Sequence, residues 1–141
     1  MDALQQSSEP QLAELAAKAV KEDRYHVRHS AEWMLKLGDG TEESHTRLQN
    51  AVNDLWRYTG EMFIADAVDE VAAAAGIAPA LSTLKPKWDA VVSDVLSRAT
   101  IVRPADDVMM RGGRAGKHTE QLGHLLAEMQ IVARSHPGAQ W

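Results

Sequence analysis

The sequence contains no cysteine among its 141 residues. This absence excludes a disulfide framework, a zinc site with thiolate ligands, an iron–sulfur cluster and a catalytic cysteine. Aromatic residues are also scarce, at 5% of the chain, and four of them are tryptophan. Alanine and leucine, which favour helices, are abundant, whereas the aromatic residues that favour strands are few. The composition therefore predicts an all-α protein in which helix packs on helix.

Long basic stretches and long apolar stretches are missing as well. The net charge is −5 and no basic stripe is visible, which argues against nucleic-acid binding through phosphate contacts. The longest apolar run, VAAAAGIA, is mostly alanine and too short to cross a bilayer. The segment MDALQQSSEP has neither the basic region nor the apolar core of a secretory signal. We therefore expect a cytoplasmic protein with no membrane and no nucleic-acid partner.

The chain does have enough apolar material for a packed core, since 45% of its residues are hydrophobic. Its length suits one domain, which we place at residues 10–141, after a disordered tail at residues 1–9. Apolar residues recur at three- and four-residue steps, and the helices expected from this pattern are 10–37, 41–75, 85–99 and 119–135. Residues 100–117 have no helical period, so we expect a loop there with room for a short strand.

Three cations lie in this loop, next to the expected start of the last helix: Arg111, Arg114 and Lys117. A helix N-terminus beside basic side chains can hold an anion, so these residues are candidates for an anion site. The stretch is not a Walker A phosphate loop, because Arg111 occupies the place of the first glycine and His118 that of the hydroxyl residue. The interpretations we favour are a solvated, flexible loop or a salt bridge from these cations to a partner.

The last helix carries a polar row of Glu120, His124 and Glu128, spaced by four residues on one face. Two carboxylates and an imidazole can ligate a metal. The row lies beside the leucine stripe of this helix and not within it, however, and such i,i+4 polar rows are common on exposed helix surfaces. We expect no metal here.

The first helix places polar residues inside its apolar stripe. At 100° per residue, Asp23, His26 and Ser30 fall within the stripe, and Glu22 lies at its edge. The acid and the imidazole are one turn apart, as in the acid-x-x-His pairs of helical di-iron proteins. Because no second such pair lies on another stripe, we expect no complete di-iron set. We interpret Glu22, Asp23 and His26 as a buried, hydrogen-bonded cluster and as candidates for a vestigial metal site.

Three stretches of the chain carry a resemblance to a known family. In order they are KEDRYHVRHSAEWMLKLGDGTEES, LWRYTGEMF and GKHTEQLGHLLAEMQIVARSHPGAQW. Together they resemble the C subunits of bacterial phenylacetyl-CoA monooxygenase, the ring 1,2-epoxidase of phenylacetate degradation. The resemblance runs from about Glu9 to Trp141. It implies a ferritin-like helical bundle, of which this chain holds the C-terminal part.

The resemblance also implies a function. In this family the di-iron centre belongs to a catalytic A subunit, which also binds the acyl-CoA, while a separate reductase supplies electrons. The C subunit is the structural partner and lacks a complete set of metal ligands. The chain is then expected to be a non-catalytic subunit, without a cofactor of its own, of the complex that epoxidises phenylacetyl-CoA. Its expected partner is the A subunit.

The chain matches only about the C-terminal half of such subunits, so we expect a fragment or a shortened gene product. The apolar stripe of the first helix then lacks its usual cover, and exposed apolar patches of that extent mark interfaces. We therefore expect a homo-oligomer or pairing with the missing N-terminal half. Two alternatives stay open. One is a self-assembling metal-binding bundle built around the polar cluster of the first helix, and the other is an acyl-CoA-binding module that uses the three loop cations.

Overall fold

A computed structural model describes residues 1–140, and these contain helices and no strand. The all-α prediction is confirmed, and the helices are consistent with part of a ferritin-like bundle. Where the sequence predicts one domain at 10–141, the structure divides into two compact units, Met1–Met110 and Arg111–Trp141. No helix of the described residues is long and apolar enough to cross a membrane.

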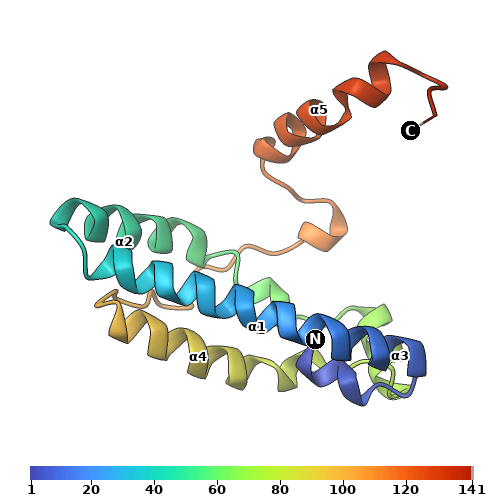
Figure 1. The fold of residues 1–141 in the computed structure, drawn as a ribbon, viewed down its shortest axis with the longest axis horizontal. Coiled ribbons are helices and arrows are strands. Elements are labelled where there is room, and N and C mark those ends of the chain that lie inside the picture. The colour runs from blue at the N-terminus through green and yellow to red at the C-terminus, as the bar shows by residue number, and fades with distance from the viewer. Residues whose placement is uncertain (141) are drawn as a thin grey trace. The chain divides into compact units, whose positions relative to one another are not determined.

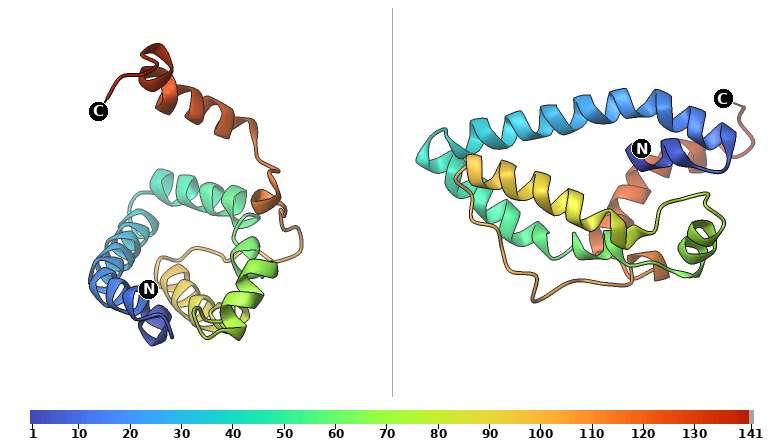
Figure 2. Two further views of the ribbon diagram at one scale, coloured as in Figure 1. Left: turned by 90° about the vertical axis from the view of Figure 1, so that its right-hand side faces the viewer. Right: turned by 90° about the horizontal axis from the view of Figure 1, so that it is seen from below.

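The first unit is built on three long helices. Figures 1 and 2 show α1 running along the unit, α2 returning antiparallel to it, and α4 running parallel to α1. Three 3-10 helices and the short α3 connect and flank them. The elements are η1 (Asp2–Gln6), α1 (Pro10–Gly38), α2 (Glu42–Trp56), η2 (Gly60–Phe63), α3 (Ala67–Ala74), η3 (Leu81–Thr83) and α4 (Lys85–Arg98).

Local signals set the ends of α1 and the start of α2 close to where the sequence predicts them. The Glu9 side chain caps α1 by accepting from the backbone N–H of Gln11, and a proline follows at the first helical position. A tight turn after Gly38 leads into α2. Thr41 caps α2 by accepting from the N–H of Ser44 at 3.1 Å.

The expected helix at 41–75 is wrong as a single element. The Thr59 hydroxyl donates to the carbonyl oxygen of Trp56 at 2.8 Å, and α2 ends there. A new helix, α3, begins after Asp66, whose side chain forms a capping box with Asp69. The side chains of Thr59, Asp66 and Asp69 act through hydrogen bonds to the backbone. A hydrophobic period alone therefore does not reveal the break.

The expected disordered tail at residues 1–9 is also wrong. Residues Asp2–Gln6 form the 3-10 helix η1, which packs on α1. The next two residues bind the end of α3: Ser7 Oγ donates to the carbonyl of Ile77 at 2.6 Å, and Ser8 Oγ to that of Ala75 at 2.9 Å. The serines that suggest disorder in the sequence therefore satisfy the carbonyl groups at a helix end.

The core of the first unit joins α2, α4 and the segment after α4. Trp56, Leu96, Ala99 and Ile101 are buried and pack as one cluster. The segment 101–110 forms no strand. Instead, the Gln49 side chain accepts from the N–H of Val102 at 2.8 Å and donates to its carbonyl at 2.9 Å, in place of a neighbouring strand.

The second unit is small and open. It consists of the 3-10 helix η4 (Gly113–Ala115) and the helix α5 (Glu120–Ser135), and neither contains a buried residue. Within this unit, apolar residues of α5 such as Leu125 and Met129 are 56% and 70% exposed.

Candidate functional site

An apolar groove of about 580 Å³ lies between α1, α2 and α4. All three helices contribute hydrophobic side chains to it, with Val27 on α1, Leu55 on α2 and Val91 on α4 among them. The polar residues His26 and Ser30 lie on the α1 side of this lining.

The groove stays open to solvent even though its lining is hydrophobic. Val27 is 55% exposed, Leu55 64% and Val91 51%. In a four-helix bundle, three helices leave a lengthwise groove that the apolar side chains of the fourth helix fill. The groove therefore has the chemistry of a surface that binds an amphipathic helix.

None of the polar candidates of the first helix, Glu22, Asp23 and His26, is buried. Their side chains are 76%, 45% and 63% exposed, so the expected burial of this cluster is wrong. Asp23 pairs with the N-terminal ammonium group of Met1 at 3.3 Å, and Glu22 approaches His26 at 3.9 Å. The reason is tertiary, since His26 lies along the open groove and Asp23 is partly covered by the N-terminal residue that pairs with it.

The loop cations lie in the second unit, around η4. Gly112 and Gly116, with φ of 100° and 83°, flank this 3-10 helix, and Arg114 lies within it. The stem of Lys117 packs over Gly112, and its backbone N–H donates to the Gly112 carbonyl at 2.8 Å. Together with the exposed Arg111, these side chains stay a predicted anion site.

The polar row of the last helix lies on the surface. Glu120, His124 and Glu128 are all exposed on α5. Among residues 1–140 there is no group of three or more histidine, aspartate and glutamate side chains arranged to hold a metal ion.

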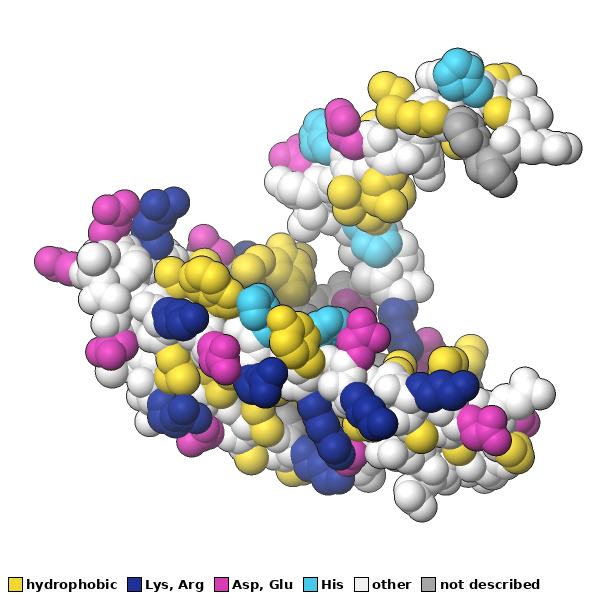
Figure 3. All heavy atoms as spheres, in the orientation of Figure 1, with side chains coloured by type: hydrophobic (Ala, Val, Ile, Leu, Met, Phe, Trp, Pro, Cys, Tyr) yellow, Lys and Arg dark blue, Asp and Glu magenta, His cyan; other side chains and the backbone are white. Residues whose placement is uncertain are grey.

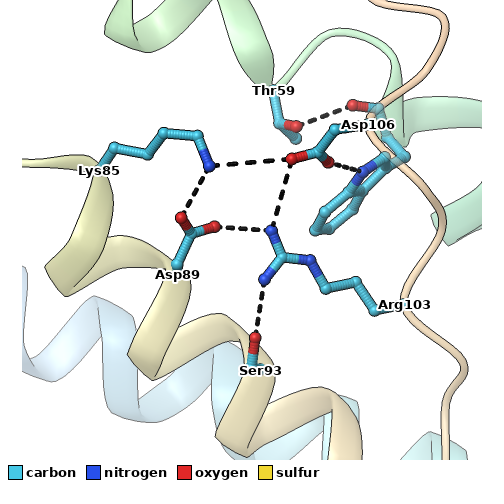
Figure 4. Close-up of polar contacts among 7 residues, drawn as sticks. Thr59, Lys85, Asp89, Ser93, Arg103 and Asp106 are labelled. Atoms are coloured by element: carbon cyan, nitrogen blue, oxygen red, sulfur yellow. Dashed lines mark hydrogen bonds and ion pairs between the residues drawn. The ribbon is translucent and has the colours of Figure 1, made fainter. Parts of the chain in front are cut away.

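A polar cluster that the sequence analysis missed ties α4 to the segment that follows it (Figure 4). Arg103 donates from Nη2 to Oδ1 of Asp89 at 2.6 Å and from Nη1 to Oγ of Ser93 at 2.7 Å. Lys85 Nζ donates to Oδ2 of Asp89 at 2.7 Å. Asp106 Oδ2 lies 3.8 Å from both cationic groups.

Two tryptophans complete this cluster. The Trp56 indole N–H donates to Asp106 Oδ1 at 2.8 Å. The Arg103 guanidinium lies 5.0 Å from the Trp56 ring centroid and 6.0 Å from that of Trp88, within the range of cation–π attraction. These contacts hold the segment 101–110 against α2 and α4.

The cluster changes the acidity of its central carboxyl group. The hydrogen bond from Lys85 is the main reason that the pKa of Asp89 lies below its ordinary value of 3.8, and the hydrogen bond from Arg103 adds to the effect. Of these contacts, the sequence shows only the i,i+4 spacing of Lys85 and Asp89, which is common on helix surfaces. Arg103 lies in a segment without periodicity, so no local pattern indicates its position.

Comparison with known proteins gives evidence that is independent of this geometry. The model of the family described as phenylacetic acid catabolic protein matches residues 1–141. The chain belongs to the phenylacetic acid catabolic protein family. It is 46% identical over 138 residues to the C subunit of 1,2-phenylacetyl-CoA epoxidase from Escherichia coli (strain K12). The predicted resemblance is confirmed.

The alignment with this E. coli protein covers the two chains to different extents. It covers 98% of the present chain but 56% of the E. coli protein. The chain thus spans about half the length of the curated relative that it matches.

The di-iron chemistry that the resemblance implies for the family's catalytic subunit needs carboxylates and histidines from four helices of a bundle. In this phenylacetic acid catabolic protein, Glu22, Asp23 and His26 all lie on one helix, with Glu22 and His26 exposed and Asp23 half-buried. Asp23 is engaged by the N-terminal ammonium group. The described residues of this chain therefore do not fit such a centre.

Proposed function

We propose that this chain is a structural, non-catalytic subunit of a cytoplasmic phenylacetyl-CoA epoxidase complex that acts in phenylacetate breakdown. Its likeness to a protein described as the C subunit of such an epoxidase supports its place in the complex. The observation that carries the structural role is the groove between α1, α2 and α4. An open apolar groove lined by three helices is a surface built for contact with another polypeptide.

The partner in this proposal supplies an amphipathic helix to the groove. Two polypeptides could supply such a helix in this proposal. One is the catalytic A subunit, which binds the phenylacetyl-CoA. The other is a polypeptide that holds the part of the relative's length that this chain does not match.

The non-catalytic part of the proposal is supported by the side chains available. The described residues offer no group of three metal-ligating side chains. The polar cluster around Arg103 joins segments of the fold, and its acids are already paired with Lys85 and Arg103.

Co-purification with a tagged catalytic subunit tests the partner. We expect Leu55→Asp and Val91→Asp to reduce recovery at least about tenfold, because each places a carboxylate in an apolar contact. Val102→Asp is the matched control, since Val102 is 73% exposed but does not line the groove. Equal recovery of all three variants would contradict the groove as the docking surface. The same variants are also tested for binding to a polypeptide that carries the part of the relative that this chain does not match. The partner whose binding they weaken is the one that supplies the helix.

An epoxidation assay tests whether this chain is non-catalytic within the complex. The catalytic subunit, its reductase and phenylacetyl-CoA are incubated with and without this chain. We expect turnover to depend on the catalytic subunit and to rise when the chain is added. Conversion of phenylacetyl-CoA by this chain, iron and reductant without the catalytic subunit would contradict a non-catalytic role.

A further inference from the structure

The outer face of α1, beside the groove, carries a row of aromatic rings at four-residue spacing. Tyr25 and His29 stack with ring centroids 5.9 Å apart and planes inclined by 16°, and His29 meets Trp33 edge-on at 6.4 Å. Arg28 lies 5.6 Å from the Tyr25 ring centroid, and Lys36 lies 5.4 Å from that of Trp33. Figure 3 shows histidine, hydrophobic and charged side chains interleaved over the middle of α1.

This row has the composition of an interface. Tyr25 is 53% and Trp33 50% exposed, which leaves two large rings open to solvent. Tyrosine, tryptophan and arginine dominate the binding energy of protein interfaces. Because the rings already stack on one another along the helix, they lose little conformational freedom when a partner covers them.

The charges at the two ends of this row are arranged about His29 in a self-complementary way. Tyr25 and Trp33 each lie four residues from His29, on opposite sides, and Glu22 and Lys36 each lie seven residues from it. A second α1 that runs antiparallel and is centred on His29 brings each Tyr25 to the level of the other copy's Trp33. It also brings each Glu22 to the level of the other copy's Lys36.

We propose that two copies of this chain pair through this face of α1, with a two-fold axis at His29. A two-fold interface uses one patch twice, so an acid at one end and a base at the other complement each other across it. A strongly acidic or strongly basic partner would meet like charge at one of the two ends. This proposal concerns a face beside the groove and does not depend on the proposed function.

The contacts already present on this face are weak enough to exchange for contacts across the dimer. Glu22 and His26 are 3.9 Å apart, and so are Arg28 and Glu32, at exposed positions where ion pairs contribute little to stability. A single helix pair covers a modest area, so the dimer dissociates in about the micromolar range.

Cross-linking tests the symmetry axis directly. The chain has no cysteine, so His29→Cys introduces its only thiol. Facing Cα atoms of two packed helices are about 5 Å apart, which suits a disulfide. Under mild oxidation we expect His29→Cys to form a disulfide-linked dimer. Arg24→Cys, an exposed site on the other side of α1, should stay monomeric. Equal cross-linking of the two variants overturns the proposal.

A charge exchange tests the register by sedimentation velocity over a concentration series. Lys36→Glu replaces two opposite-charge pairs with like-charge pairs and should raise the dimer dissociation constant about tenfold. The double variant Glu22→Lys, Lys36→Glu restores both pairs with the signs reversed and should restore the dimer. The proposal fails if the chain is monomeric at every concentration. It also fails if Lys36→Glu has no effect, if the double variant does not recover, or if this face captures another protein while the chain stays monomeric.

Discussion

Arg103 shows how a single side chain can join segments that are far apart in the sequence. Its guanidinium contacts Asp89 and Ser93 on α4 and lies over the ring of Trp56 on α2. Its side chain and that of Asp89 are each only 29% exposed. Hydrogen bonds to charged groups are stronger in such partly shielded sites than on open surfaces. The cluster therefore contributes more to stability than the exposed i,i+4 ion pairs of the same helices.

Asp89→Asn tests this difference. The substitution removes the charge that accepts from Lys85 and Arg103, so we expect a lower free energy of unfolding at neutral pH. The matched control is Asp94→Asn, because Asp94 pairs with Arg98 at an exposed site of the same helix and should change stability much less. Urea unfolding followed by tryptophan fluorescence measures both. Equal losses in the two variants would contradict a special role for the cluster.

The same carboxyl group gives a pH dependence with a definite sign. The pKa of Asp89 is lower in the folded chain than its ordinary value of 3.8, so the native state holds this proton less tightly than the unfolded state. The stabilisation is fully present above pH 3.8 and is lost as the pH falls through the lowered folded pKa. We expect the stability gap between wild type and Asp89→Asn to be constant from pH 7 to about pH 5 and to narrow below about pH 4. A gap that widens on acidification would show that the sign is wrong.

At the scale of elements, the crossing of α1 and α4 depends on a glycine. Gly38 ends α1 directly against Ala99, and a Cβ at this position would collide with the Ala99 carbonyl oxygen. Ala99 is fully buried beside Leu96 and Ile101, so it cannot move away freely. The glycine is therefore needed for close packing as well as for ending the helix.

Gly38→Ala should lower the free energy of unfolding by about 1–3 kcal/mol, as overpacked sites do. Gly123→Ala is a control that should raise the free energy of unfolding instead of lowering it. Gly123 lies within α5 with no neighbouring atom within 4 Å of an added Cβ, so alanine should improve helix formation there by up to about 1 kcal/mol. Thermal unfolding followed by circular dichroism measures both. A neutral Gly38→Ala would mean that α1 and α4 can separate without loss.

At the scale of the whole molecule, the first unit is closed by a segment without regular structure. Ile101 is 4% exposed within the core, and Arg103 and Asp106 bind side chains of α4 and α2. Farther along, the backbone N–H of Met110 donates to the carbonyl of Arg57 at 2.8 Å. The residues that complete the first unit thus continue to Met110, past the last of its helices.

Two truncations test this boundary. A chain that ends after Met110 should retain cooperative unfolding and the helical signal of the first unit, because the contacts of the core lie within it. A chain that ends after Thr100 loses Ile101 and Arg103 and should be less stable by at least about 2 kcal/mol, from the loss of a buried isoleucine alone. Urea unfolding compares the two. Equal stability of the two chains would show that residues 101–110 do not complete the fold.

The sequence by itself determined the class of the fold, the positions of α1, α4 and α5, and the family. These features depend on apolar residues at helical spacing, on proline and glycine at helix ends, and on three stretches of local similarity, all of which are readable along the chain. The break between α2 and α3 also has local signals, in Thr59 and in the Asp66–Asp69 capping box. The hydrophobic pattern continues across the break, however, and for that reason the sequence predicted one helix there.

Only the tertiary structure decided which of the predicted surfaces are covered. The periodicity of α1 places Asp23 and His26 among apolar neighbours, but whether that side is buried depends on helices elsewhere in the chain. The partners of Arg103 likewise depend on a segment that has no periodicity. The physical reason is the same in both cases. Helix propensity and capping act over a few residues, whereas burial and ion pairing depend on segments that the chain must first bring together.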